Sequence, residues 1–181
     1  MIVSGFDEVG RGAWAGPLTV VGVSLASEEF AGLRDSKYYS GKKRQKIYGR
    51  IMRTAQAISI CWISNSEIDT NGLGPSLSKA FKGCATNLPS STVRIVDGSV
   101  NYLNDFVNSF SEPKADDTYP AVAAASIVAK HLRDSYMQSV HNIFPDYLFM
   151  SNVGYGTKDH KAALSKIGPC RLHRLSFKGV R

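Results

Sequence analysis

Short apolar runs and apolar stripes at helical spacing alternate along the chain. Short runs rich in β-branched residues predict strands at residues 2–6, 18–25, 57–63 and 92–96. Apolar stripes and one long alanine-rich stretch predict helices at residues 42–57, 75–87, 119–141 and 158–167. The first two predicted strands follow one another without a helix, so we expect a mixed sheet flanked by helices and not a purely parallel sheet.

Several segments between these elements lack both patterns. Residues 64–69 are polar, residues 99–112 are irregular, and residues 152–157 form a glycine-rich stretch. We expect loops there, and a short helical and basic segment at the C-terminal end of the chain. The 181 residues, 43% of them hydrophobic, are enough for one core, so we expect a single domain over residues 1–181.

The charge balance is basic, with a net charge of +7. This excess favours a polyanionic partner, although a nucleic acid, an anionic membrane surface and solubility alone all agree with it. The N-terminus lacks the pattern of a signal peptide, and the longest uncharged stretch, near residues 120–129, is about half of the roughly 20 residues that span a bilayer. We expect a cytoplasmic monomer without a membrane contact.

The cysteines and histidines predict neither a disulfide framework nor a zinc site. Cys61, Cys84 and Cys170 are an odd number at wide spacing, which is typical of buried free thiols. The four histidines show no HxxxH or cysteine-adjacent spacing, so zinc is not expected.

Acidic residues stand where predicted strands end or a predicted helix begins. Asp7 and Glu8 follow the first strand, Asp97 follows the strand that ends near residue 96, and Asp116 and Asp117 precede the long helix. Mg²⁺ and Mn²⁺ prefer hard oxygen ligands, and two such ions can stabilise both oxygens of a phosphodiester displacement. An acidic centre within a basic protein is the combination that a metal-dependent nuclease needs.

Each acidic position also has an ordinary structural interpretation. A single acidic pair beside glycines is usually a solvated turn, and adjacent strand residues point to opposite faces. Asp7 and Glu8 would reach one site only if the backbone twists at residues 9–10, which Gly10 permits. Asp97 alone could be a turn residue, and Asp116 could be a helix N-terminal charge. Spacing alone leaves these alternatives open.

A long motif adds what spacing lacks. The segment GFDEVGRGAWAGP at residues 5–17 resembles the N-terminal signature of ribonuclease HII. The similarity continues in family order through LRDSK at 33–37, KR at 43–44, EID at 67–69, VDG at 96–98, KAD at 114–116, AAASIVAK at 123–130, RD at 133–134, GY at 154–155 and HRLSF at 173–177. These motifs extend across almost the whole chain.

The resemblance implies a ribonuclease H-like α/β fold with a mixed central sheet flanked by helices. It implies an endonuclease that cuts the RNA strand of RNA–DNA hybrids and nicks duplex DNA on the 5′ side of a single embedded ribonucleotide, by a two-metal-ion mechanism with Mg²⁺ or Mn²⁺. The matching metal-binding carboxylates are Asp7, Glu8, Asp97 and Asp116. Asp117 is a neighbour of the matching position, and Asp134 reads more simply as the partner of an Arg or Lys on its helix.

The resemblance also implies residues that recognise the substrate. Gly10, Arg11 and Gly12 match a loop whose backbone approaches the ribose 2′-hydroxyl, the group that distinguishes RNA from DNA. Glycines allow that close approach, and Arg11 could pair with a phosphate. Tyr155 matches a tyrosine that stacks beside the ribonucleotide at the RNA–DNA junction. Without the motif, the loop reads as an ordinary turn and Tyr155 as a half-buried tyrosine.

Several cations are expected to contact phosphates, although as surface charges they could serve solubility alone. They are Lys37, Lys43, Arg44 and the basic tail at residues 171–174. Asp35 and Ser36 are expected to shape their turn and not to touch the substrate.

Three residues depart from the family pattern. Gly156 stands where many relatives have proline, Leu175 where a second basic residue is common, and Trp14 where a smaller residue is expected. Ribonuclease HIII, a sister group, usually bears an additional substrate-binding domain and lacks the arginine between the two glycines, so the compact chain and Arg11 favour HII.

Two other classes of function remain as rivals. A nucleic-acid-binding module could keep the fold without catalysis, but the presence of all four carboxylates speaks against it. A two-carboxylate glycosidase would explain an acidic pair, but neither the basic charge nor the glycine loop.

Overall fold

The computed structural model of the chain describes residues 2–26, 30, 32–89 and 93–180. A five-stranded sheet has the order β3-β2-β1-β4-β5. The strands are β1 (Ile2–Val9), β2 (Leu18–Ala26), β3 (Ala57–Ile63), β4 (Val93–Asp97) and β5 (Ser109–Glu112). β2 runs antiparallel to both β1 and β3, whereas β4 runs parallel to both β1 and β5. The prediction of a mixed sheet is confirmed.

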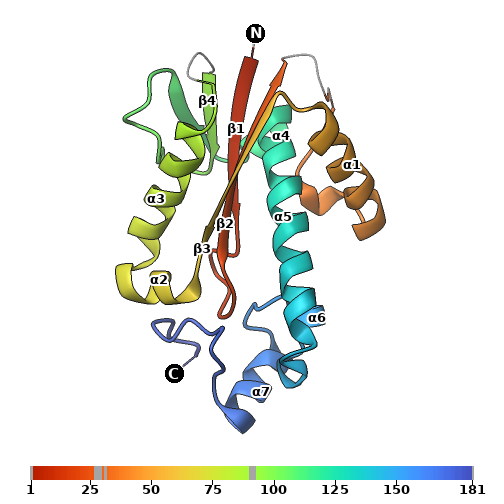
Figure 1. Cartoon of the computed structure of the whole chain (residues 1–181), viewed down its shortest axis with the longest axis vertical. Coiled ribbons are helices and arrows are strands. Elements are labelled where there is room, and N and C mark those ends of the chain that lie inside the picture. Colours follow the sequence, from red (N-terminus) through yellow and green to blue (C-terminus); the bar gives the residue numbers. More distant parts are fainter. Residues whose placement is uncertain (1, 27–29, 31, 90–92, 181) are drawn as a thin grey trace.

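Helices cover both faces of the sheet (Figure 1). They are η1 (Ser36–Tyr38), α1 (Gly41–Thr54), α2 (Asn65–Asn71), α3 (Leu73–Thr86), α4 (Ala115–Thr118), α5 (Pro120–His141), η2 (Pro145–Tyr147), α6 (Phe149–Asn152) and α7 (Lys158–Ile167). Figure 1 places α2 and α3 on one side of the sheet, and α1 and α5 on the other. No helix in the described part of the chain is long and apolar enough to cross a membrane.

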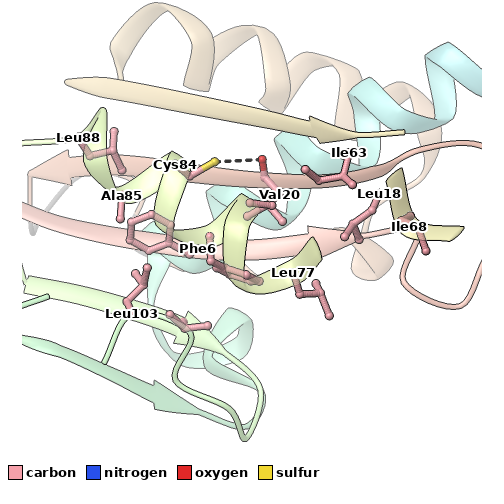
Figure 2. Packing of buried hydrophobic residues seen from close by; sticks show 13 residues of the cluster. Phe6, Leu18, Val20, Ile63, Ile68, Leu77, Cys84, Ala85, Leu88 and Leu103 are labelled. Atoms are coloured by element: carbon pink, nitrogen blue, oxygen red, sulfur yellow. Dashed lines mark hydrogen bonds between the residues drawn. The ribbon is translucent and has the colours of Figure 1, made fainter. Parts of the chain in front are cut away.

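The alternation of side chains along β2 divides the apolar core between the two faces. Val20 points to the face covered by α3, where Phe6 and Phe81 are also buried (Figure 2). Val21 points to the opposite face and packs in the cluster that includes Ile51 of α1. Both faces of the sheet are therefore shielded from water near its centre.

The alanine-rich start of α5 lies directly against the backbone of β1. A Cβ atom on Gly5 would stand 2.1 Å from the backbone nitrogen of Val122 and 2.2 Å from the carbonyl carbon of Ala121. Only glycine fits at such a contact. The small alanine side chains of this helix allow the close approach, which brings the start of α5 to β1.

Most of the predicted elements are present, with shifted ends. The helix predicted at residues 42–57 ends at Thr54, and β3 follows from Ala57. The strand predicted at residues 92–96 corresponds to β4, which the structure describes from Val93 to Asp97, and residue 92 lies outside the described residues.

Two predicted loops are wrong. Residues 65–71 form α2, which begins where the Ser64 hydroxyl accepts a hydrogen bond from the Glu67 amide at 3.1 Å. Residues 109–112 form β5, which pairs with β4 at the edge of the sheet. β5 therefore forms through its backbone pairing with β4 in spite of a weak apolar pattern.

Candidate active site

Asp7 and Asp97 lie side by side because β1 and β4 run parallel. The register pairs Phe6 with Val96, so the next residue on each strand is a carboxylate near the same end of the sheet. One oxygen each from Asp7, Asp97 and Asp116 lies within 4.8 Å of the others. The structure thus brings together three carboxylates that are far apart in the sequence.

A hydrogen bond fixes the third carboxylate beside the strands. The Asp97 Oδ1 accepts from the backbone amide of Ala115 at 2.9 Å, which holds the start of α4 against the end of β4. Lys114, just before α4, adopts a left-handed conformation with φ of 63°. The chain therefore turns sharply, and Asp116 comes to lie beside Asp97 while Asp117 remains exposed.

Glu8 reaches the same cavity from the other face of the strand. It pairs with Val20, whereas Asp7 pairs with Val21, and these valines belong to different core clusters. Asp7 and Glu8 nevertheless both line one cavity of about 330 Å³. The Glu8 Oε1 lies 3.6 Å from the Arg11 Nη1, and Glu8 is not among the three carboxylates within 4.8 Å of one another.

Burial and the charges of neighbouring carboxylates make Asp7, Glu8 and Asp116 hard to ionise. Burial, then the charges of Glu8 and Asp97, raise the pKa of Asp7 well above its usual range. Burial, then Asp97 and Asp35, raise the pKa of Asp116 to about 6. The pKa of Glu8 is raised by burial, although Arg11 opposes this shift. A divalent cation would relieve the repulsion, and carboxylate oxygens are the ligands that Mg²⁺ and Mn²⁺ prefer. The donor set therefore fits such an ion.

Residues of the 33–37 motif form one wall of the cavity. Asp35 accepts from the amide of Lys37 at 3.1 Å and from the Ser36 hydroxyl at 3.0 Å, so its predicted role in the turn is confirmed. Asp35 and Ser36 also line the cavity, which the sequence did not indicate. The Lys37 Nζ lies 2.9 Å from Asp35, with its side chain 84% exposed at the cavity.

Ser126 and Lys130 of α5 also line this cavity. The Ser126 hydroxyl donates to Ser36 at 3.1 Å, and Lys130 pairs with Asp134 at 2.9 Å. The interpretation of Asp134 as the partner of a cation on its helix is confirmed. No role was predicted for Ser126 or Lys130, although both belong to the 123–130 motif, whose match to the family was the available signal.

The glycine loop and Tyr155 meet at the cavity. The backbone amide of Gly10 donates to the Tyr155 hydroxyl oxygen at 3.2 Å, and Arg11 and Gly12 line the same cavity. Gly10 has φ of +90°, and a Cβ there would stand 2.2 Å from the Arg133 Nε. Glycine is required at this position for both reasons.

Arg133 anchors these loops from inside the protein. Its buried guanidinium donates to the carbonyl oxygens of Ala15, Pro17 and Val153 at 3.0, 2.8 and 2.9 Å. Its Cζ also lies 5.3 Å from the centre of the Tyr155 ring. Arg133 belongs to the 133–134 motif, but nothing in the sequence indicates this anchoring role.

The remaining predicted cations lie away from the carboxylates. The Lys43 Nζ lies 5.1 Å from the centre of the Tyr39 ring and lines a different cavity. Arg44 lies 3.6 Å from Asp134 and donates to two backbone carbonyl oxygens. The prediction that Arg174 contacts phosphate is wrong, because its side chain is fully buried and donates to the carbonyl oxygens of Gly16 and Arg11.

Two departures from the family pattern prove to be complementary. A Cβ on Gly156 would stand 2.2 Å from the Trp14 Cε2, and a Cβ on Gly179 would stand 2.2 Å from its Cζ2. The Trp14 indole therefore occupies space that larger residues at positions 156 and 179 would fill. The amides of Trp14 and Ala15 both donate to the Gly154 carbonyl oxygen, which joins the two loops.

The cysteines partly match their prediction. All three cysteines are free thiols, with Cys84 buried and Cys61 and Cys170 half-buried. Among the described residues, the group that could hold a metal consists of aspartates and contains neither histidine nor cysteine.

Comparisons with known proteins agree with this architecture. The family model described as Ribonuclease HII matches residues 4–180. The chain is 38% identical to a ribonuclease HII of Rhizobium leguminosarum bv. trifolii, over 99% of this chain and 79% of that protein.

Solved structures show the same fold. Ribonuclease H2 of Pyrococcus horikoshii OT3 is similar with a TM-score of 0.83 at 23% identity, covering 100% of this chain and 96% of that one. The Bst ribonuclease HIII in complex with Mn²⁺ has a TM-score of 0.80 at 19% identity, covering 99% of this chain and 68% of that one. These likenesses confirm the ribonuclease H-like α/β fold.

The sequence match and the fold agree over nearly the whole length of the chain. They exclude the glycosidase alternative. The chain belongs to the ribonuclease HII family and is a metal-dependent endoribonuclease with ribonuclease H activity, the class of enzyme that acts on RNA–DNA hybrids.

Proposed function

We propose that this enzyme, in addition to cutting RNA–DNA hybrids, nicks duplex DNA on the 5′ side of a single embedded ribonucleotide. The observation that carries the proposal is the contact between the Gly10 amide and the Tyr155 hydroxyl in the cavity that also holds Asp7. A backbone segment able to approach a 2′-hydroxyl and an aromatic ring able to stack thus lie beside the carboxylates.

Asp7, Asp97 and Asp116 are the residues that would hold Mg²⁺ or Mn²⁺, with Glu8 completing the set from the opposite face of β1. Their mutual repulsion supports this assignment, because it favours a cation among them. Two bound ions would activate water and stabilise the departing 3′-oxygen. Mn²⁺ is present with a ribonuclease HIII of the same fold, and either ion suits this set of ligands.

The protein's own residues would bind and orient the substrate. We assign the backbone of Gly10 and Gly12 to the ribose 2′-hydroxyl, because a Cβ at position 12 would meet nothing within 4 Å and the main chain is therefore open to a ligand. Arg11, whose side chain is 57% exposed, would contact a phosphate. Lys37 would do the same at the other wall of the cavity.

The proposal depends less on Lys43 and Arg44 than on Arg11 and Lys37. Lys43 is exposed on α1 and would contact phosphates further along the duplex, outside the carboxylate cavity. Arg44 is already engaged by Asp134 and two carbonyl oxygens, so we expect its effect on binding to be indirect.

A duplex DNA with one ribonucleotide tests the proposal. With Mg²⁺ or Mn²⁺, the protein should give one nick on the 5′ side of the ribonucleotide, and EDTA or Asp97→Asn should abolish it. An all-DNA duplex of the same sequence is the matched control. Binding of the ribonucleotide duplex without a nick, at metal concentrations that support cleavage of a long hybrid, would overturn the proposal.

The same assay separates catalysis from recognition. If Arg11→Ala and Tyr155→Ala leave the discrimination between all-DNA and ribonucleotide-containing duplexes unchanged, the recognition assignment is wrong even though catalysis is intact. If the protein cuts neither substrate but binds both, it is a binding module of this fold.

A further inference from the structure

Two buried imidazoles face one another behind the Tyr155 loop. His160, in the first turn of α7, and His173, near the C-terminal end, are 0% and 1% exposed. Their Nε2 atoms lie 2.9 Å apart. Neither residue lines the carboxylate cavity, so the proposed function leaves this pair without a role.

The backbone groups at the two ends of this pair determine which nitrogens carry protons. The Tyr155 carbonyl oxygen lies 2.9 Å from the His160 Nδ1 and can only accept, so this nitrogen must donate. In a neutral ring the His160 Nε2 is then an acceptor, and His173 must donate to it from its own Nε2. The His173 Nδ1 is left with a lone pair, which accepts from the Cys170 amide at 2.9 Å.

The opposite assignment fails at both ends. It would set a lone pair of His160 against the Tyr155 carbonyl oxygen. An N–H on the His173 Nδ1 could then reach the Cys170 carbonyl oxygen at 3.2 Å, but it would face the nearer Cys170 amide at 2.9 Å. Only one neutral arrangement satisfies the three contacts at 2.9 Å, so the four groups form a directional chain of hydrogen bonds from Cys170 to Tyr155.

The surroundings keep the pair neutral. Burial lowers the pKa of both rings, that of His173 to about 4. The side chains packed on them are the rings of Tyr147, Phe149 and Trp14. Cys170, whose amide contacts His173, adds a thiol nearby. None of these groups is charged near neutral pH. A proton added to either ring would turn an acceptor into a second donor at 2.9 Å.

These hydrogen bonds connect residues 170–173, which Asn65 holds in place, to the loop that bears Tyr155. The Asn65 side-chain amide of α2 donates to the carbonyl oxygens of Arg171 and His173. These contacts hold the backbone around His173, where the series of hydrogen bonds begins. The other end is the carbonyl oxygen of Tyr155, whose hydroxyl accepts from Gly10. Displacement of this carbonyl would move the tyrosine relative to the glycine loop.

We propose that His160 and His173 are positioning residues that hold Tyr155 against the glycine loop, and that they set the preference for a single ribonucleotide in DNA over a long hybrid. The inference rests on the proposed function, in which Tyr155 lies beside the ribonucleotide. It goes further by assigning this preference to two residues that touch no substrate.

Two substitutions of His173 test its hydrogen bonds to Cys170 and to His160 separately. His173→Asn keeps an oxygen that can accept from the Cys170 amide but lacks the Nε2 donor, whereas His173→Gln can place an amide donor toward His160. We expect His173→Asn to raise KM for the single-ribonucleotide duplex roughly fivefold to tenfold, the range of one buried hydrogen bond, with kcat nearly unchanged. His173→Gln should recover part of this loss, and His141→Asn, at the end of α5, is the matched control without effect.

A double substitution decides whether the effect passes through Tyr155. In a Tyr155→Ala background, His173→Asn should cost nothing further on the single-ribonucleotide duplex. The inference is overturned if His173→Asn impairs both substrates equally, or if its effect persists without the Tyr155 ring.

A spectroscopic measurement keeps the inference testable without activity. The ¹⁵N shifts of the wild-type protein should show a protonated Nδ1 on His160 and a protonated Nε2 on His173 at neutral pH. The opposite tautomers would overturn the chain of hydrogen bonds. Absence of nicking by the wild-type protein would instead refute the proposed function, so the two failures are distinguishable.

Discussion

The carboxylate cavity and the loops at residues 10–17 and 153–155, which Arg133 and Arg174 anchor, bury polar groups in opposite ways. In the cavity, Asp7, Asp97 and Asp116 lie together, and burial and like charge raise the pKa of Asp7 and Asp116. In the loops, Arg133 and Arg174 are fully buried, and their guanidinium groups donate to backbone carbonyl oxygens. The loops thus hold a fixed geometry, whereas the cavity holds negative charge that an incoming cation can neutralise.

The largest expected effect comes from removing a charge at the cavity. Asp116→Asn should lower the rate of hybrid cleavage by roughly 10²–10³-fold, the usual cost of losing one electrostatic group at a reaction centre. Its free energy of unfolding should be unchanged or higher, because one repulsive charge is lost. Single-turnover cleavage and urea denaturation measure the two quantities.

The neighbouring residue is a matched control for this prediction. Asp117 is exposed in the same turn of α4, and Asp117→Asn should keep nearly full activity. Equal losses in the two variants would show that the charge of α4 as a whole matters and that Asp116 has no special role.

The sequence indicated which carboxylates could form the site but not how they come together. Asp7 and Asp97 could be proposed because each follows an apolar run, but their adjacency depends on the parallel pairing of β1 with β4, which no spacing shows. The family resemblance supplied that step. Arg174 was misinterpreted because an arginine near a chain end usually lies in water, and its partner Gly16 is 158 residues away.

The two elements that were not predicted, α2 and β5, differ in whether the sequence contains a signal for them. For α2, the Ser64-x-x-Glu67 spacing is a helix start signal that the polar composition of the segment obscured. For β5, four residues with a single apolar side chain give no pattern, and the strand exists through its pairing with β4. Trp14 and Gly156 were each noticed as departures, but their complementarity requires knowing that they touch.

A change in the loops should affect stability more than chemistry. Arg133→Met would leave the carbonyl oxygens of Ala15, Pro17 and Val153 without their donor, and we expect it to lower the free energy of unfolding by about 2–4 kcal/mol. Urea denaturation measures this loss. Arg53→Met, at an exposed position of α1, should change stability by less than about 0.5 kcal/mol. A similar small change at Arg133 would mean that its hydrogen bonds add little.

The contact between Trp14 and Gly156 predicts a smaller and conditional effect. Gly156→Ala should cost about 1–3 kcal/mol of unfolding free energy, because the new methyl group would overlap the indole. In a Trp14→Leu background the same substitution should cost less, and the difference is the coupling between the two positions. Gly74→Ala is the control, because a Cβ there would meet nothing within 4 Å. Additive costs would contradict the complementarity.

The remaining expected effect is the dependence of stability on pH that the imidazole pair introduces. Burial lowers the folded-state pKa of His173 from 6.5 to about 4. As the pH falls below 6.5, the unfolded chain binds a proton that the folded chain excludes, so stability should fall between about pH 6.5 and pH 4 and level off below. Carboxylates also titrate in this window, so the useful quantity is the wild-type slope minus that of His173→Asn. We expect a difference of up to about 3 kcal/mol in urea denaturation across the window. Parallel curves would mean that His173 is not held neutral, and the pair would then lack the directional hydrogen bonds that distinguish the loops from the cavity.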